Sequence, residues 1–208
     1  MILILTGRSG CGKNAVAEWL ISHYGYEMVK TCTTRKRRDG EPEDAYYFMT
    51  EDEFKAGIME GRFAEFDIYV RNYYGTLRSS LEQCEKALII ATPDGAYHIK
   101  KVFPETFVVH IATDMKTAVL RAISREEKLD PGILKRISDR ATQDNALFAQ
   151  PDCNFTLDNP EGMSLYSAAE RIAAAHENWA VDHLMKGTNR MLKEMRTDLE
   201  EYEEKQHE

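Results

Sequence analysis

The sequence predicts an α/β fold in which a parallel sheet is covered by helices, and three observations support this. The chain begins with the continuous apolar run MILIL, and such runs are typical of strands buried on both faces of a sheet. Two similar runs follow at 87–92 (ALIIAT) and 107–113 (FVVHIAT). The stretches after these runs carry apolar residues at helical spacing, and strands that alternate with helices indicate a parallel sheet.

The first strand is followed by a glycine-rich stretch and then by a predicted helix. Helical spacing begins at Lys13, and Gly25 stands where a helix would end. Further along, a weaker strand is expected at 154–159, and helices are expected over 94–102, 115–125 and 163–179.

Residues from about 31 to 86 differ in pattern from the rest of the chain, because aromatic and charged residues are interleaved there. We expect this region to form a small subdomain that is inserted between two strands of the main sheet. Thr50 followed by Glu53 is the pattern of a capping box. It predicts a short helix that stops near Gly61.

Length and composition exclude several classes of protein. A chain of 208 residues with 43% hydrophobic residues suits an ordinary globular protein with one sizeable core. A net charge of -8 argues against a general nucleic-acid binder. The apolar runs are too short to span a bilayer, and the four cysteines form no C-x-x-C pair. The first residues lack the charged region and the full apolar stretch that are typical of a signal peptide. We expect a cytoplasmic protein with no membrane partner and no nucleic-acid partner.

The C-terminal tail is a distinct segment. Residues 194–208 contain seven acids and two bases on strong helix formers. We predict a main domain at 1–180 and a charged helical extension at 181–208. The extension is expected to be solvated or to pack against a partner, and an assembly of identical chains through this helix is one form of the second expectation.

The stretch GRSGCGKN matches a phosphate-binding loop up to its last residue. Glycines let the backbone wrap around phosphate with its N–H groups pointing inward, and the helix that follows adds a favourable dipole. The alternative is a glycine-rich turn without a ligand. The residues expected to bind the phosphates of ATP are Gly7, Arg8, Ser9, Gly10, Cys11, Gly12, Lys13 and Asn14.

A basic segment follows at 31–48, with four bases in a row at 35–38. Such a run can be a localisation or nucleic-acid signal, but four acids come directly after it, and paired arginines also suit a bidentate grip on phosphate. Further on, Glu65 stands between two phenylalanines. Its carboxylate can accept hydrogen bonds from two adjacent N–H groups of a guanine edge, although a surface acid is the simpler interpretation of this residue alone.

Taken together, these stretches resemble the guanylate kinase family along roughly residues 1–160. The matching pieces are GRSGCGKN, TTRKRRDGE, FAEF, NYYGT and a lid-like SREEKLDPGILKRI. The resemblance implies a three-layer P-loop NTPase fold with a parallel core sheet, an inserted nucleotide-monophosphate-binding subdomain at about 31–86 and a short lid at about 121–140. It also implies a phosphotransferase of purine nucleotide metabolism that uses ATP and Mg²⁺ to phosphorylate GMP or dGMP.

The resemblance assigns three groups of residues. The site for the acceptor phosphate falls on Arg35, Arg38, Tyr46 and Tyr74, with Glu41 nearby. The positions that read guanine fall on Thr31, Glu65, Thr76 and Thr92. The catalytic positions, which neutralise charge on the moving phosphoryl group, fall on Lys13, Arg125 and Arg136.

Two departures from the family pattern concern the metal and the base. Asn14 stands where a metal-binding hydroxyl is expected, and Ile90 and Thr92 occupy the places of two acids. The weak magnesium ligands that remain are Asn14 and, through a water, Asp94. Thr92 offers guanine a hydroxyl in place of a carboxylate, which relaxes base selection by about 1.5–3 kcal/mol.

Three functions therefore compete: a GMP kinase, a kinase of the same build for another phosphorylated acceptor, and a non-enzymatic protein-binding module. The base-pocket residues argue against a sugar phosphate as acceptor. Lys13 and the two lid arginines argue against the module, whereas Asn14 and the lost acids favour it.

Overall fold

The computed structural model describes residues 1–207 except for 38–39, 70, 127, 150 and 160–162. It contains two compact units, Met1–Ala173 and Ala174–Glu208. The first unit holds both sheets, and the second belongs to the C-terminal helix. The domain ranges expected from the sequence, including the subdomain and the lid, stay predictions.

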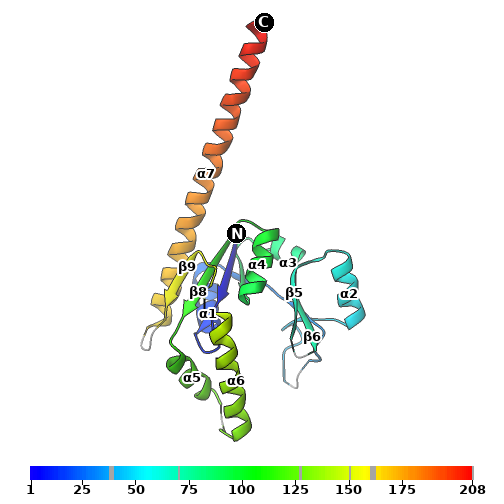
Figure 1. The fold of residues 1–208 in the computed structure, drawn as a ribbon, viewed down its shortest axis with the longest axis vertical. Helices are drawn as coiled ribbons and strands as arrows, with labels where there is room; N and C mark the ends of the chain where they lie inside the picture. Colours follow the sequence, from blue (N-terminus) through cyan, green and yellow to red (C-terminus); the bar gives the residue numbers. More distant parts are fainter. Residues whose placement is uncertain (38–39, 70, 127, 150, 160–162, 208) are drawn as a thin grey trace. The chain divides into compact units, whose positions relative to one another are not determined.

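The main sheet of the first unit has five strands, and every pair of neighbours is parallel. Figure 1 shows two of these neighbours, β8 and β9, side by side. Its strand order is β2-β7-β1-β8-β9. The strands are β1 (Ile2–Thr6), β2 (Glu27–Met28), β7 (Ala87–Ile90), β8 (Thr106–Ala112) and β9 (Phe155–Asp158). The predicted parallel sheet and the three apolar runs assigned to it are thus confirmed.

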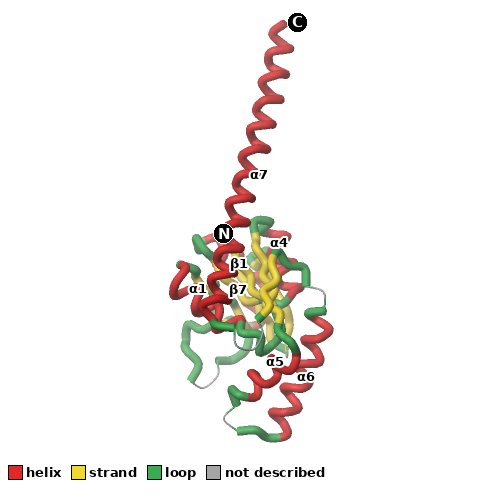
Figure 2. Tube along the Cα trace, turned by 90° about the vertical axis from the view of Figure 1, so that its left-hand side faces the viewer, coloured by secondary structure: helices red, strands yellow, loops and turns green. Residues whose placement is uncertain are grey.

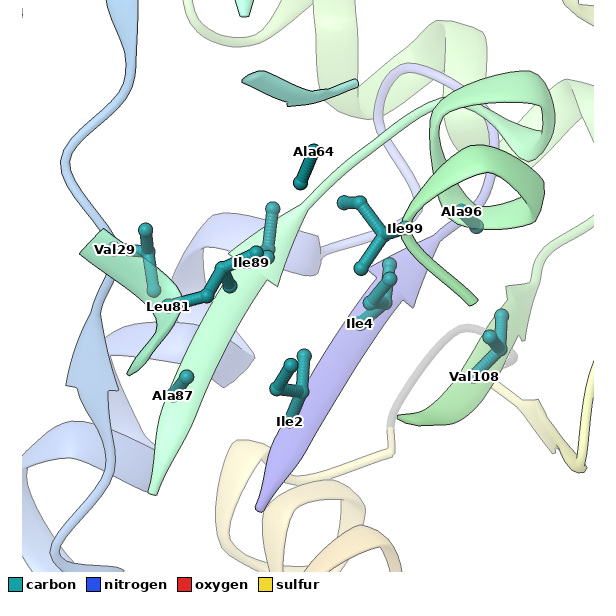
Figure 3. Packing of buried hydrophobic residues seen from close by; sticks show 10 residues of the cluster. All are labelled: Ile2, Ile4, Val29, Ala64, Leu81, Ala87, Ile89, Ala96, Ile99 and Val108. Carbon is teal, nitrogen blue, oxygen red and sulfur yellow. The ribbon is translucent and has the colours of Figure 1, made fainter. Parts of the chain in front are cut away.

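Helices cover both faces of this sheet, so the α/β fold class is confirmed. Helix α1 (Lys13–Tyr24) contacts β1, β2 and β7, and α4 (Pro93–Val102) contacts β1 and β8. In Figure 2 these two helices lie on opposite sides of β1 and β7. On the α4 side, Ile4 and Ile89 of the sheet pack with Ile99 of the helix in one buried cluster (Figure 3). This packing fixes the sheet from which the site is built.

A second sheet of four strands is formed by residues between 32 and 77, in the order β4-β3-β6-β5. Its strands are β3 (Cys32–Thr33), β4 (Tyr47–Phe48), β5 (Phe63–Tyr69) and β6 (Asn72–Leu77), and its helices are α2 (Glu51–Met59) and α3 (Arg78–Glu82). The stacked rings of Phe54 and Phe63, with centroids 4.3 Å apart, join α2 to the sheet.

The remaining helices are α5 (Met115–Ile123), α6 (Pro131–Leu147) and α7 (Leu165–His207). The prediction for 115–125 is confirmed with an earlier end at Ile123, and α6 had not been predicted as a helix. The helix expected over 163–179 continues to His207, because the charged tail is itself helical. None of the helices in the described part of the chain combines the length and the apolar character of a membrane span.

The capping box of α2 is confirmed, and it provides a test of local stability. The Thr50 hydroxyl accepts a hydrogen bond from Glu53 N at 3.2 Å, and the Glu53 carboxylate accepts one from Thr50 N at 2.8 Å. We expect Thr50→Ala to lower the free energy of unfolding by about 1 kcal/mol, because the helix start loses an acceptor. Urea unfolding measures this. The control Thr142→Ala removes an exposed threonine inside α6 and should change stability by no more than about 0.5 kcal/mol. Equal effects of the two substitutions would contradict the capping role.

Candidate active site

The candidate active site lies at the carboxyl edge of the main sheet, where the loops after the parallel strands meet. Thr6 of β1 pairs with His110 of β8, and Leu5 pairs with Ile90 of β7, so these strands end at nearly the same level. The glycine-rich stretch follows β1 directly, and Thr92 follows β7. Open parallel sheets bind ligands at this edge.

The glycine loop is held in one shape by close packing. Gly10 has a φ of 82°, and a Cβ added there would lie 2.3 Å from the carbonyl oxygen of Ala118 in α5. Only glycine fits at this position. Beside it, the buried Asn159 donates from Nδ2 to the carbonyl oxygen of Cys11 at 2.7 Å. The loop therefore approaches α5 closely and is fastened by the residue that follows β9.

Lys13 places a positive charge inside this loop. Its Nζ donates to the carbonyl oxygens of Gly7 at 2.6 Å and Arg8 at 2.9 Å, and it lies 3.7 Å from Cys11 Sγ. Lys13 is also the first residue of α1, whose N-cap is Gly12, so no cap side chain occupies the first-turn amides at this end. An ammonium group beside an uncapped helix start is the arrangement that binds phosphate.

Helix α6 contacts the glycine loop through two side chains near its C-terminal end. Asp144 Oδ2 accepts a hydrogen bond from Ser9 N at 2.6 Å, and Asn145 Oδ1 accepts one from Arg8 Nη2 at 3.3 Å. Asp144 Oδ1 also lies 3.1 Å from Arg140 Nε, one turn earlier on the helix. These contacts bring α6 and the loop to the same cavity.

This cavity has a volume of about 600 Å³ and lies between the glycine loop, α5 and α6. Both predicted lid arginines line it, together with Arg8, Lys135 and Arg140. Arg136 pairs with Glu126 at 2.8 Å but keeps a side-chain exposure of 66%, and Arg125 is exposed. The structure thus gathers five basic side chains beside the loop, where they can neutralise a polyphosphate.

A second group of predicted residues meets around Arg35, next to β3. Its guanidinium makes a two-point contact with Glu41, with distances of 2.7 and 3.0 Å. It also lies 5.4 Å from the ring centroid of Tyr46, which packs edge-on against Tyr74. The hydrogen bond with Glu41 is the main cause that raises the pKa of Arg35, and the Tyr74 hydroxyl adds to it. Three predicted acceptor-site residues, Glu41, Tyr46 and Tyr74, therefore lie around the fixed cation of a fourth, Arg35.

Glu65 and Thr76 form a third group across β5 and β6. They are paired in the antiparallel register, and the Thr76 hydroxyl donates to Glu65 Oε1 at 2.6 Å. Burial raises the pKa of Glu65 against the opposing effect of this hydrogen bond. A Cβ added at Gly95 would lie 3.5 Å from Glu65 Oε2, so the carboxylate faces the start of α4. There Thr92 caps the helix by accepting a hydrogen bond from Gly95 N at 3.2 Å.

The other predicted acceptor residues are placed less directly. Thr31 and Tyr46 line a cavity of about 480 Å³ beside Ile90 of β7, which is the place of one of the lost acids. This cavity is lined by residues of β2 and β7 in the main sheet and by the residues that precede β3 and β4 of the second sheet. Arg38 lies outside the described residues.

The predicted metal ligands do not form a pre-built cation site. Asn14 and Asp94 are both exposed. Within the described part of the chain, no three His, Cys, Asp or Glu side chains are grouped so that they could hold a metal ion. One neutral amide oxygen and one exposed carboxylate fit a magnesium ion only if its remaining ligands are phosphate oxygens and waters.

The sequence did not single out Asp144, Asn145 or Asn159, although all three contact the glycine loop. Asp144 and Asn159 are separated by 135 and 148 residues from their partners in the loop, so no spacing rule could connect them. The only local sign was the position of Asn159 at the end of a predicted strand, at the edge where ligands bind.

Comparison with known proteins gives consistent matches. A sequence model of the family described as guanylate kinase matches residues 1–172. The guanylate kinase of Clostridium acetobutylicum is 30% identical over 142 residues, which are 65% of this chain and 68% of that protein. The guanylate kinase of Streptococcus agalactiae serotype III is 28% identical over 202 residues, which are 93% of this chain and 95% of that protein.

A solved structure shows the same fold. The crystal structure of guanylate kinase from Anaplasma phagocytophilum matches with a TM-score of 0.61 at 20% sequence identity, and the match covers 84% of this chain and 82% of that one. At this identity the likeness supports the fold, and the chemistry depends on the residues described above.

Proposed function

The chain belongs to the guanylate kinase family, and from this premise we propose that it is a kinase that transfers the γ-phosphoryl group of ATP to GMP. The observation that carries the choice of acceptor is the placement of Tyr74 and Thr76 on β6. Two residues apart on a strand, they face the same side, and each belongs to a different group of the site. Glu65 and Thr76 suit the hydrogen-bonding edge of guanine. Arg35, Tyr46 and Tyr74 suit a phosphate. Strand β6 contributes a residue to each group, so the two groups can bind the base and the phosphate of one nucleotide.

On the donor side, the glycine loop and Lys13 bind the phosphates of ATP. The amides at the start of α1 donate hydrogen bonds to the phosphate oxygens, and Lys13 leaves its carbonyl partners to contact the terminal phosphates. Arg125 and Arg136 approach from the lid side of the 600 Å³ cavity. This arrangement concentrates positive charge around the negatively charged oxygens of the phosphoryl group that is transferred.

In the reaction, a phosphate oxygen of GMP attacks the γ-phosphorus of ATP, and the bond to the β,γ-bridging oxygen breaks, so that ADP leaves. Such a transfer needs alignment and charge neutralisation and no covalent enzyme intermediate. Glu41 keeps the Arg35 guanidinium in place so that it can orient the acceptor phosphate. Mg²⁺ bound with ATP would neutralise phosphate charge, held by Asn14 and, through a water, by Asp94.

The cytoplasmic location and the assembly of identical chains through residues 181–208, both expected from the sequence, stay part of the proposal. Neither is needed for the site, because all of its residues lie in the unit Met1–Ala173.

A coupled assay of ADP release tests the proposal. Mg-ATP is supplied with GMP, dGMP, AMP, CMP, UMP or a sugar phosphate, and the highest kcat/KM is expected for GMP or dGMP. Turnover confined to another acceptor would replace GMP in the proposal. No turnover with any acceptor, together with no ATP binding in calorimetry, would favour the protein-binding module.

Glu65 predicts a specific pH dependence of acceptor binding. The ionised carboxylate accepts two hydrogen bonds from guanine, and burial raises the pKa of this group. We therefore expect KM for GMP to rise as the pH falls through this raised pKa, at a higher pH than for an ordinary glutamate. The measurement is KM for GMP between about pH 5 and pH 8.

Glu65→Gln is the matched variant for this measurement, because it keeps the size of the side chain and cannot ionise. Its KM should be high at every pH. The phosphate of GMP also titrates, with a second pKa of about 6, but this change is shared by both proteins and cancels in the ratio of their KM values. A ratio that stays constant over the pH range would contradict the role of Glu65.

A further inference from the structure

We propose that Asp144 is a positioning residue for the phosphoryl transfer: it fastens helix α6 to the glycine loop and thereby places Arg136 beside the donor phosphates. This inference rests on the proposed function. It concerns a side chain that no motif marked and that lies outside the groups assigned to ATP and GMP.

The contact between Asp144 and the loop is short and buried. Ser9 N donates to Asp144 Oδ2 at 2.6 Å, and the side chain of Asp144 is only 2% exposed. A buried carboxylate is stable only when charge or hydrogen bonds compensate for its lost hydration. Here the loop amide compensates one oxygen and the guanidinium of Arg140 lies 3.1 Å from the other. Separation of α6 from the loop would leave this carboxylate without its backbone partner.

The spacing along α6 connects this contact with catalysis. Arg136, Arg140 and Asp144 follow one another at intervals of four residues, so they share one face of the helix. All three line the 600 Å³ cavity with Ser9 of the loop. Arg136 lies two turns, or about 12 Å, from Asp144 along the helix axis. Because the helix is rigid between them, the fastening at Asp144 sets where Arg136 can reach.

Asn145 strengthens the same junction. Its Oδ1 accepts a hydrogen bond from Arg8 Nη2 at 3.3 Å, on the residue before Ser9. Two consecutive residues of α6 thus contact two consecutive residues of the loop. A junction of this kind fixes the rotation of the helix as well as its distance from the loop, and rotation decides whether Arg136 faces the cavity.

A double-mutant cycle tests the proposal. Asp144→Ala should lower kcat at least tenfold and leave KM for GMP within twofold, because the acceptor site is untouched. In the background of Arg136→Ala, the same change should lower kcat by less than a further twofold, because Asp144 acts through Arg136. Asp144→Asn keeps an oxygen acceptor for Ser9 N and should retain more activity than Asp144→Ala. The control Thr142→Ala alters an exposed residue two positions earlier on α6, where the side chain faces away from that of Asp144, and should leave kcat unchanged.

Stability and backbone exchange separate positioning from simple loss of folding. Thermal unfolding is followed for every variant, and hydrogen exchange of the Ser9 amide should accelerate in Asp144→Ala and not in Thr142→Ala. The proposal would be overturned if the fold-loss of kcat in the double variant equalled the product of the losses in the two single variants. It would also be overturned if the Ser9 amide stayed protected from exchange in Asp144→Ala. If Asp144→Ala does not fold, the cycle is completed with Asp144→Asn. Absence of turnover in the unmodified chain would instead overturn the proposed function first, so the two failures are distinguishable.

Discussion

Lys13→Ala is expected to lower kcat by roughly 100- to 1000-fold, the loss typical of removing one preorganised charged donor from a transition state. The Nζ of Lys13 already lies within the loop, bonded to two carbonyl oxygens, so it needs only a short movement to contact a terminal phosphate. KM for GMP should stay within about twofold, because the predicted acceptor residues lie outside the glycine loop and α1. Steady-state kinetics with saturating ATP and varied GMP measure both quantities.

Two further variants make this result specific. Lys13→Arg keeps the charge but not the compact ammonium, and it should recover only a small part of kcat. Lys116→Ala removes an exposed lysine at the start of α5 and should behave as the unmodified protein. Equal losses in kcat and in GMP affinity for Lys13→Ala would contradict its role on the donor side.

Arg35→Ala is expected to raise KM for GMP by about 10- to 100-fold, which corresponds to the loss of one charged hydrogen bond. Its effect on kcat should be smaller, which is the reverse of the result for Lys13. Arg35 is fixed by Glu41 and by the ring of Tyr46, so little side-chain entropy is lost when phosphate binds. A titration of GMP at saturating ATP measures the change.

The neighbour Arg37 provides the matched control for this prediction. Its side chain is 46% exposed, and its guanidinium pairs with the exposed Glu43 at 3.3 Å. Arg37→Ala removes the same charge from the same segment and should leave KM for GMP unchanged. A similar increase in both variants would show that general charge, and not the geometry around Arg35, governs acceptor binding.

The parts of the fold that the sequence predicted well are those with strong local signals. The stretch from the first strand to Gly25 was correct in every element, because buried apolar runs, glycines and helical spacing act over a few residues. The β5–β6 hairpin was missed for the opposite reason. Its turn contains Arg71 at a φ of 61° where a glycine or asparagine would mark it, and Phe66 and Ile68 of β5 are exposed.

The candidate site shows the same division. Arg35, Tyr46 and Tyr74 were predicted and lie together, since the resemblance carried the long-range information that spacing lacks. The contacts of Asp144 and Asn159 with the loop join residues more than 130 positions apart, and aspartate or asparagine in a helix or after a strand has many other uses. The two-point contact between Arg35 and Glu41 was also missed, because a sequence cannot show that a cation meant for a ligand is already paired with an acid.

The strand order has a consequence for the synthesis of the chain. Strand β1 is synthesised before both strands with which it pairs, β7 at 87–90 and β8 at 106–112. Its apolar residues therefore have no partner strand until about 80 further residues have been synthesised. Closing the long loop between β1 and β7 slows folding. We expect nascent chains that end before residue 87 to remain unfolded and to depend on chaperones for protection from aggregation.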